Sequence, residues 1–307
     1  MPSSILATDN ILAQTKAGQQ RSQEIRLLTS QLAKVFKMTP QLLFVEDLPA
    51  NLRKRSSLLR LDLRNPALIE DLKNSLKALH PSWQLHLESG DSIGQILKGI
   101  KELDPLFTVI ATRGKTGIAK FFLGSVTEEV VRNSPSPVLV LGPKFKRAPI
   151  PADPKKGLKI LVLSDLTQAS ARAENFAITL AKKTGGQVTL MSSVGDTILH
   201  LKRVYYQSRI PLRSMNSQIR EIKKFAQLSM QKRANAFFKQ GIPVRTKLRT
   251  REVEIEKDML EEISYGYDLL LMGTHSRNRL LATFLGSTAR KACLLSPIPV
   301  LILRSGG

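Results

Sequence analysis

A stretch that occurs twice constrains this chain more than any other feature. The segment Pro105–Leu141 aligns without a gap to the segment 162 residues further on, and 11 of the 37 aligned positions are identical. The identities gather in Phe-Leu-Gly-Ser (122–125 and 284–287) and in Ser-Pro-x-Pro-Val-Leu (134–139 and 296–301). Two copies separated by about half of the 307 residues predict a duplicated domain.

Each copy has the pattern strand, glycine loop, helix, proline turn and strand. Leu106–Ile110 and Leu269–Met272 are short continuous apolar runs, typical of parallel strands covered on both faces. Gly124-Ser125 and Gly286-Ser287 follow at a predicted helix start, where Ser is a favoured N-cap. Each helix is expected to end at Ser-Pro-x-Pro, because proline lacks an amide donor and restricts the residue before it.

Apolar strands and amphipathic helices alternate along the rest of the chain. The predicted strands are 5–9, 41–46, 83–88, 106–110, 138–141, 159–165, 187–194, 242–248, 269–272 and 300–303. The longer predicted helices are 20–36, 66–80, 92–103, 217–240 (after a Tyr- and Arg-rich lead-in) and 254–264. This predicts an α/β protein of two tandem Rossmann-like domains, each an open five-stranded parallel sheet with helices on both faces. We expect domains at 1–143 and 157–307, joined by a linker rich in Pro and Lys at 144–156.

The composition is that of a globular protein, with 42% hydrophobic and 23% charged residues. Cys293 is the only cysteine, which excludes an intramolecular disulfide, and its place on the apolar side of a helix predicts a core position. The first residues lack the basic and apolar regions of a signal peptide. No run approaches the roughly 18 apolar residues of a membrane span. We therefore expect a cytoplasmic protein.

The net charge of +22 is high and unevenly distributed. Between Ile198 and Arg251 there are fourteen Lys and Arg against one acid, Glu221, a net +13. Within the predicted helix 217–240 the residues Arg220, Lys223 and Lys224 lie away from the apolar stripe. A solvated surface helix explains this pattern, and an anionic partner (nucleic acid, acidic lipid or acidic protein) is the functional alternative.

Parallel sheets of this type bind ligands at the carboxyl ends of strands, where the strand order reverses. Asp9 and Asp165 end the first strand of each half, and the loops of Gly114 and Gly273 follow the fourth strands. If first and fourth strands are neighbours, acid and loop lie together. Backbone amides at the Gly-Ser helix starts can then accept phosphate oxygens. The alternatives are a tight turn with no ligand, and aspartates that cap local turns.

No catalytic group stands out in these loops. His275 lies in the second glycine loop, but no acid or nucleophile at a telling spacing supports a general base there. The four histidines of the chain offer no metal cluster. We interpret His275 as a loop histidine near the ligand or in solvent, and expect neither a catalytic residue nor a metal site.

The stretches Thr112–Leu141 and Gly273–Leu303 resemble the universal stress protein family. Its ATP-binding members carry G-x2-G-x9-G-[S/T], then a helix and a final strand like Pro-Val-Leu-Val. The resemblance covers both halves and indicates a tandem member. It implies that the aspartate contacts adenine, that the glycine loop and G-[S/T] hold phosphates, and that the final strands pair across a two-fold axis. An internal pseudo-dimer would place Val138–Leu141 beside Val300–Leu303.

The motif is incomplete in both halves. In the first half Ala111 replaces the opening glycine, while the later motif positions match. In the second half Ser276 replaces the second glycine, and Arg277 and Arg279 follow as anion-contact candidates. The candidate nucleotide-binding residues are Asp9, Val45, Gly114, Gly124, Ser125, Val126, Asp165, Gly273, Ser276, Gly286, Ser287 and Thr288.

These observations predict a non-catalytic, cytoplasmic stress-response protein regulated by ATP or another adenine nucleotide, with or without Mg²⁺. One alternative is a slow ATP hydrolase on the same site. Another is a scaffold that binds an anion or polyanion and no nucleotide. Both halves are expected to hold an anion. Because Gly114 keeps the phosphate loop of the first half nearly intact, that half is favoured to hold a whole nucleotide.

Overall fold

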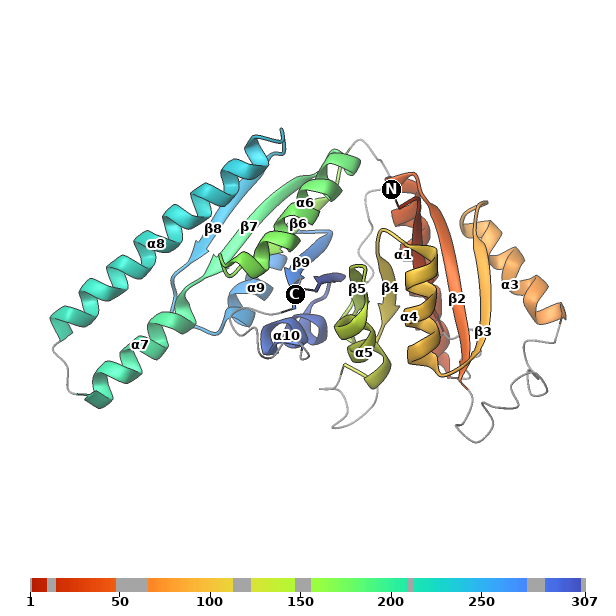
Figure 1. The fold of residues 1–307 in the computed structure, drawn as a ribbon, viewed down its shortest axis with the longest axis horizontal. Helices are drawn as coiled ribbons and strands as arrows, with labels where there is room; N and C mark the ends of the chain where they lie inside the picture. The colour runs from red at the N-terminus through yellow and green to blue at the C-terminus, as the bar shows by residue number, and fades with distance from the viewer. Residues whose placement is uncertain are drawn as a thin grey trace. The chain divides into compact units, whose positions relative to one another are not determined.

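The computed structural model describes residues 2–9, 15–47, 66–112, 123–146, 156–208, 212–274 and 285–304. The chain divides into two compact units, whose main segments are Met1–Ala152 and Asp153–Val300. Each half contains its own set of parallel strands with helices beside them (Figure 1). Among the helices of the described residues, none has the length and apolar character needed to cross a membrane.

The first half alternates strands and helices throughout. Its elements are β1 (Ser4–Thr8), α1 (Lys16–Phe36), β2 (Thr39–Asp47), α3 (Pro66–Leu79), β3 (Gln84–Gly90), α4 (Ser92–Leu103), β4 (Thr108–Ala111), α5 (Ser125–Asn133) and β5 (Val138–Leu141). The strand order is β3-β2-β1-β4-β5, and every pairing in it is parallel. The order therefore reverses between β1 and β4, which is the switch point of this half.

The second half repeats this topology, and its described residues include one more α-helix and also a 3-10 helix. Its elements are β6 (Lys159–Leu163), the 3-10 helix η3 (Gln168–Ser170), α6 (Ala171–Thr184), β7 (Gln187–Ser193), α7 (Gly195–Ser208), α8 (Leu212–Phe238), β8 (Val244–Arg249), α9 (Ile255–Ile263), β9 (Leu269–Gly273), α10 (Ser287–Leu295) and β10 (Val300–Leu303). The strand order is β10-β9-β6-β7-β8, so β6 and β9 form the switch point.

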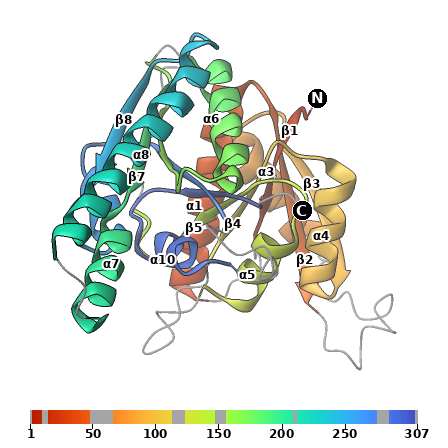
Figure 2. The same cartoon turned by 60° about the vertical axis from the view of Figure 1, so that its left-hand side comes forward.

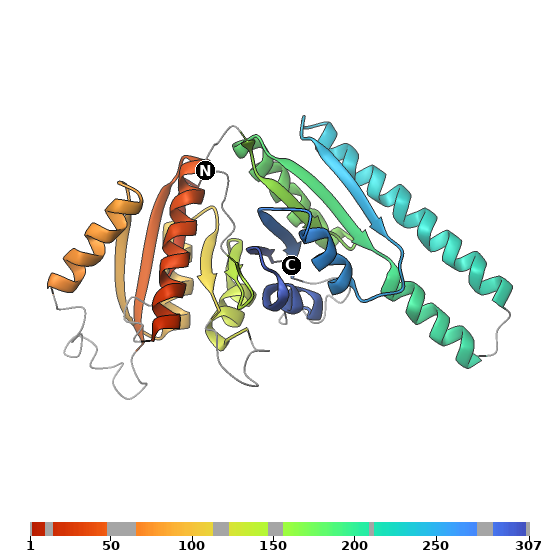
Figure 3. The same cartoon turned by 180° about the vertical axis from the view of Figure 1, so that it is seen from behind.

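Helices cover both faces of each sheet, as the continuous apolar strands require. In the first half α4 and α5 lie on the face seen in Figure 1, and α1 and α3 lie on the face seen in Figure 3. Every residue of β1 and β5 is buried, and so is every residue of β10. Cys293 on α10 is fully buried as predicted, and burial raises the pKa of its thiol to about 12.

The segment between β7 and β8 differs from the sequence prediction. The Tyr- and Arg-rich lead-in is itself a helix, α7, in which Ile198 and Tyr205 are buried seven residues apart on one face. The following helix, α8, begins at Leu212 rather than Ser217. Polar and charged residues at most other positions of α7 obscured its apolar periodicity. Figures 1 and 2 both show α8 running along β8.

Candidate functional site

The two aspartates lie where the strand order reverses. In the second half Leu163 of β6 pairs with Met272 of β9, so Asp165 and Gly273 follow at the same edge of the sheet. In the first half Ala7 of β1 pairs with Val109 of β4, which brings Asp9 to the corresponding edge. First and fourth strands are therefore neighbours in both halves, which was the condition for acid and glycine loop to lie together.

Asp165 has one carboxylate oxygen engaged and one open. Its Oδ1 accepts hydrogen bonds from the Thr167 amide (3.0 Å), from the Thr167 hydroxyl (2.7 Å) and from the Ser170 hydroxyl. The Ser170 hydroxyl also accepts from the Asp165 amide at 3.1 Å. The other oxygen, Oδ2, is buried and has no hydrogen-bond partner among the described residues. Turn capping, the alternative to ligand binding, thus explains the contacts of only one of the two carboxylate oxygens.

A ring of polar contacts holds the loop that carries Asp165. Glu174 of α6 accepts from the Ser164 hydroxyl at 2.6 Å, and that hydroxyl oxygen accepts from the Leu166 amide at 3.0 Å. Arg233 of α8 donates to Glu174 and to the backbone oxygen of Thr167, both at 2.5 Å. Within this loop Leu166 has φ 61, in the left-handed region that a leucine adopts only under constraint.

Asp9 has different surroundings. Its Oδ2 accepts from both Nε and Nη2 of Arg26 on α1, each at 2.7 Å. The Asp9 side chain is 1% exposed, and Arg26 covers it. The described contacts make Asp9 one side of a buried ion pair. The turn that Asp9 would cap, the structural alternative suggested by the sequence, lies outside the described residues.

Glycine starts the last helix of each half, for two different physical reasons. Gly124 occupies the N-cap of α5 at φ 88 and ψ 135, a conformation open essentially to glycine alone. Gly286 has an ordinary φ of −57, but a Cβ there would lie 2.8 Å from the backbone oxygen of Thr274. The expectation of a serine cap was wrong, because Ser125 and Ser287 are the first helical residues and neither N-cap has a side-chain hydrogen bond.

These helix starts leave backbone amides available to an anion. The first amides of an α-helix have no partner within the helix, and its N-terminus carries partial positive charge. Ser125 and Ser287 are exposed, while Val126 and Thr288 are partly buried beside them. Val45, near the carboxyl end of β2, is also partly buried. Gly114, His275, Ser276, Arg277 and Arg279 lie outside the described residues.

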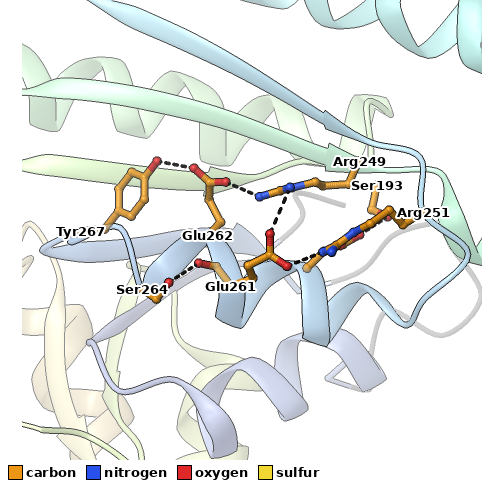
Figure 4. Close-up of polar contacts among 8 residues, drawn as sticks. Ser193, Arg249, Arg251, Glu261, Glu262, Ser264 and Tyr267 are labelled. Carbon is orange, nitrogen blue, oxygen red and sulfur yellow. Dashed lines mark hydrogen bonds and ion pairs between the residues drawn. The ribbon is translucent and has the colours of Figure 1, made fainter.

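A second polar cluster, which the sequence analysis missed, lies between α9 and the ends of β7 and β8 (Figure 4). We call it the α9 cluster; it consists of Ser193, Arg249, Arg251, Asp258, Glu261, Glu262 and Tyr267. Arg251 donates to fully buried Asp258 (Nη2 to Oδ1, 2.5 Å) and to Glu261 (2.6 Å). Ser193 donates to the other oxygen of Asp258 at 3.2 Å.

Arg249 and Tyr267 hold the other buried acid of the α9 cluster. Glu262, 1% exposed at its side chain, accepts from Arg249 at 2.7 Å and from the Tyr267 hydroxyl at 2.8 Å. Burial, together with the adjacent Glu262 carboxylate, raises the pKa of Tyr267 to about 12. Three of the four acids of α9 pair with Arg249 at the end of β8 or with Arg251 just beyond it, and the fourth, Glu256, pairs with Lys291 of α10. Only the packing of the folded chain shows these partners.

The α9 cluster and Arg233 explain part of the basic excess between Ile198 and Arg251. Four of the fourteen basic residues (Lys202, Arg233, Arg249 and Arg251) pair with acids that lie outside that range. Arg220, Lys223 and Lys224, by contrast, are exposed on α8 and have no ion pair with a described residue. The basic residues of this range therefore include a group that pairs with acids and stabilises the fold. They also include an exposed group that has no ion pair with a described residue.

Comparison with known proteins agrees with this architecture. The universal stress protein family matches at residues 13–142 and again at 158–304. Among solved structures, a universal stress protein from Archaeoglobus fulgidus is 18% identical over 99% of this chain and 96% of its own, with a TM-score of 0.65. A putative universal stress protein from Pseudomonas aeruginosa is 18% identical over 98% of this chain and 93% of its own, with a TM-score of 0.58.

A universal stress protein solved in complex with cAMP covers 45% of this chain and 94% of its own, at 16% identity and a TM-score of 0.32. A search of curated proteins finds no match. The family match spans both halves and most of the chain, with the same strand–loop–helix–strand repeat at the end of each half. The chain is a tandem member of the universal stress protein family.

Proposed function

We propose that this protein is a non-catalytic, cytoplasmic stress-response regulator that binds ATP or another adenine nucleotide at its switch points. The observation that carries the proposal is the open oxygen of Asp165, which is buried at the carboxyl edge of β6 and β9 without a donor among the described residues. A buried carboxylate oxygen without a partner is costly, so it favours a ligand that brings a donor. The amino group of adenine and the hydroxyls of ribose are such donors.

The start of α10 supplies the complementary end of the site. The backbone amide of Gly286 donates to the backbone oxygen of Thr274 at 3.0 Å, so α10 begins beside the end of β9. The amides of Ser287 and Thr288 belong to the first turn and suit phosphate oxygens. Mg²⁺ bound with the nucleotide would leave this arrangement of protein donors unchanged.

The two halves differ in what they offer a nucleotide. The glycine loop favours the first half, through Gly114. The acid favours the second half, because Arg26 pairs with Oδ2 of Asp9, whereas Oδ2 of Asp165 has no hydrogen-bond partner among the described residues. We propose that both halves hold an anion at the helix start and that the second half holds the adenine end more tightly. This differs from the sequence-based ranking, which gave the phosphate loop more weight than the adenine end.

Titration of the full chain with ATP tests the proposal. Asp165→Asn keeps the side-chain shape but turns the open acceptor into a donor, and is expected to weaken ATP binding about tenfold or more. The matched variant Asp9→Asn should leave the tighter site unchanged. Gly286→Val and Gly124→Val test the two helix starts in the same way. No binding to the wild-type chain at millimolar ATP would refute nucleotide binding altogether.

Analysis of the nucleotide after binding tests the non-catalytic part. A regulator returns ATP unchanged after prolonged incubation with Mg²⁺, whereas a slow hydrolase accumulates ADP. If ADP accumulates in the wild type and not in Asp165→Asn, the protein is a hydrolase acting at this site. Native mass spectrometry of freshly purified protein identifies any nucleotide that co-purifies.

A further inference from the structure

The outward side of α8 carries large apolar side chains among unpaired cations. Its buried stripe, which includes Ala226, Met230 and Phe237, packs toward the sheet. On the opposite side Phe225 is 72% exposed and Leu228 is 56% exposed. A 27-residue helix with its apolar stripe already buried has no folding requirement for a second apolar pair.

Cations flank the two apolar side chains. At 3.6 residues per turn, Lys224, Phe225, Leu228 and Lys232 fall within about 100° of the helix circumference. We call these four residues the outer face of α8. Both lysines are exposed and have no ion pair with a described residue. Glu221, also on this side, is the only acid of the helix, so the outer face keeps a positive charge.

The neighbouring helix extends the same chemistry. α7 contacts α8 and exposes Tyr206 to 66%. It also exposes Arg203. Aromatic rings with a polar end and basic side chains are the residues that gather at the boundary between lipid headgroups and hydrocarbon. Arg233 of α8, which pairs with Glu174, points to the inner side of the helix and takes no part here.

We propose that the outer face of α8 docks on an anionic lipid bilayer, with Phe225 and Leu228 entering the headgroup region and Lys224 and Lys232 contacting acidic headgroups. Charge complementarity calls for an anionic partner. The apolar pair decides which one: nucleic acid would gain affinity from the lysines but would leave Leu228 in water, whereas a bilayer accommodates both. The contact is peripheral, because the helix remains packed on its sheet.

Vesicle flotation of the full chain tests the proposal. Vesicles of phosphatidylcholine mixed with phosphatidylserine are expected to bind the protein at low salt, and vesicles of phosphatidylcholine alone are not. The double variant Phe225→Ala with Leu228→Ala should weaken binding about tenfold or more, since two large apolar side chains no longer leave water. The variant Lys224→Gln with Lys232→Gln should weaken it by a similar factor, at about fivefold per cation.

Matched substitutions elsewhere control for general effects. Tyr265→Ala removes another exposed aromatic residue, and Lys73→Gln with Lys77→Gln removes two exposed lysines of α3. Both are expected to bind vesicles like the wild type. Phe225→Trp should be quenched by brominated lipid, while the wild type, whose single tryptophan is Trp83, should not.

Three outcomes would overturn the proposal. The first is the absence of any binding to anionic vesicles at low salt. The second is binding that depends on the lysines but not on Phe225 and Leu228, which would indicate a purely electrostatic contact. The third is that Phe225→Ala with Leu228→Ala weakens binding to single-stranded or duplex nucleic acid but not to vesicles, which would identify a nucleic-acid surface. None of these binding measurements contains ATP, so they test the membrane contact independently of nucleotide binding.

Discussion

Arg233 is the residue on which the loop after β6 depends. It joins α8 to Glu174 and to the backbone of Thr167, and Glu174 in turn holds Ser164. The side chains of Arg233 and Glu174 are 17% and 8% exposed, so water replaces little of what is lost when one of them is removed. The strained backbone of Leu166 persists only while these contacts hold it.

Arg233→Gln is therefore expected to destabilise the second half by about 3 kcal/mol, because it leaves the Glu174 carboxylate buried without its cation. Chemical denaturation measures this free energy of unfolding. The adjacent Lys232→Gln, at an exposed position, should change it by less than about 0.5 kcal/mol. The stability of Arg233→Lys should fall between them, because a lysine can pair with Glu174 but lacks the second guanidinium nitrogen that donates to the Thr167 oxygen. Equal stability of Arg233→Gln and Lys232→Gln would contradict the role of Arg233.

Tyr267 should make stability depend on pH at the alkaline end. A free tyrosine ionises near pH 10, as it would in the unfolded chain, whereas the folded protein raises the pKa to about 12. The folded state thus binds the proton more tightly. Its contribution is complete below pH 10 and is lost as the pH rises toward 12. Tyr267→Phe should remove this part of the decline in denaturation curves, and exposed Tyr265→Phe should not. If the free energy of unfolding of Tyr267→Phe declines with pH as steeply as that of the wild type, the contribution of Tyr267 is refuted.

At the scale of elements, the two glycine-started helices differ from the serine-capped helices that the motif suggests. If serine were the cap, Ser125→Ala and Ser287→Ala would each cost about 1 kcal/mol. We expect both to be nearly neutral. Gly124→Ala should instead cost about 2 kcal/mol through backbone strain. Gly286→Ala should cost a similar amount, because its Cβ meets the Thr274 oxygen. Thermal and chemical denaturation of the four variants decide between cap and glycine.

Local sequence patterns predicted most of the fold and part of the site. The continuous apolar runs and the repeat predicted parallel strands. That the first and fourth strands are neighbours was only a condition for the site in the sequence analysis, and the strand order of each half meets it. The positions of Asp9 and Asp165 at strand ends followed from the same patterns. Their long-range contacts did not, because Arg26 reaches Asp9 only through the packing of α1, and Arg233 reaches the Thr167 backbone in the loop of Asp165 only through the packing of α8. For the same reason the basic excess could not be divided into paired and unpaired arginines.

At the scale of the whole molecule, we propose that the two halves form an internal pseudo-dimer, with 144–156 as the linker between them. β5 and β10 each stand at one end of the strand order of their own half, and both are continuous apolar runs. An apolar strand with an unpaired edge invites pairing with another strand. The two closing strands are therefore natural partners.

Hydrogen exchange tests this proposal in the full chain. If the closing strands pair, the amides of 138–141 and 300–303 should exchange as slowly as those of the central strands β1 and β6. The strands β3 and β8, at the other ends of the two strand orders, provide the comparison. Closing strands that exchange as fast as β3 and β8 would rule out the pairing.

The two proposals place a different ligand on each side of the helix α8. Its inner side touches the loop of Asp165 through Arg233, and its outer side presents Phe225 and Leu228 to the surroundings. A helix that takes part in two binding events can link them thermodynamically. If membrane contact alters the packing of α8, it changes the affinity for nucleotide, and nucleotide then changes the affinity for membrane by the same factor. This reciprocal coupling requires only that the two ligands act on opposite sides of the same helix and favour different arrangements of it.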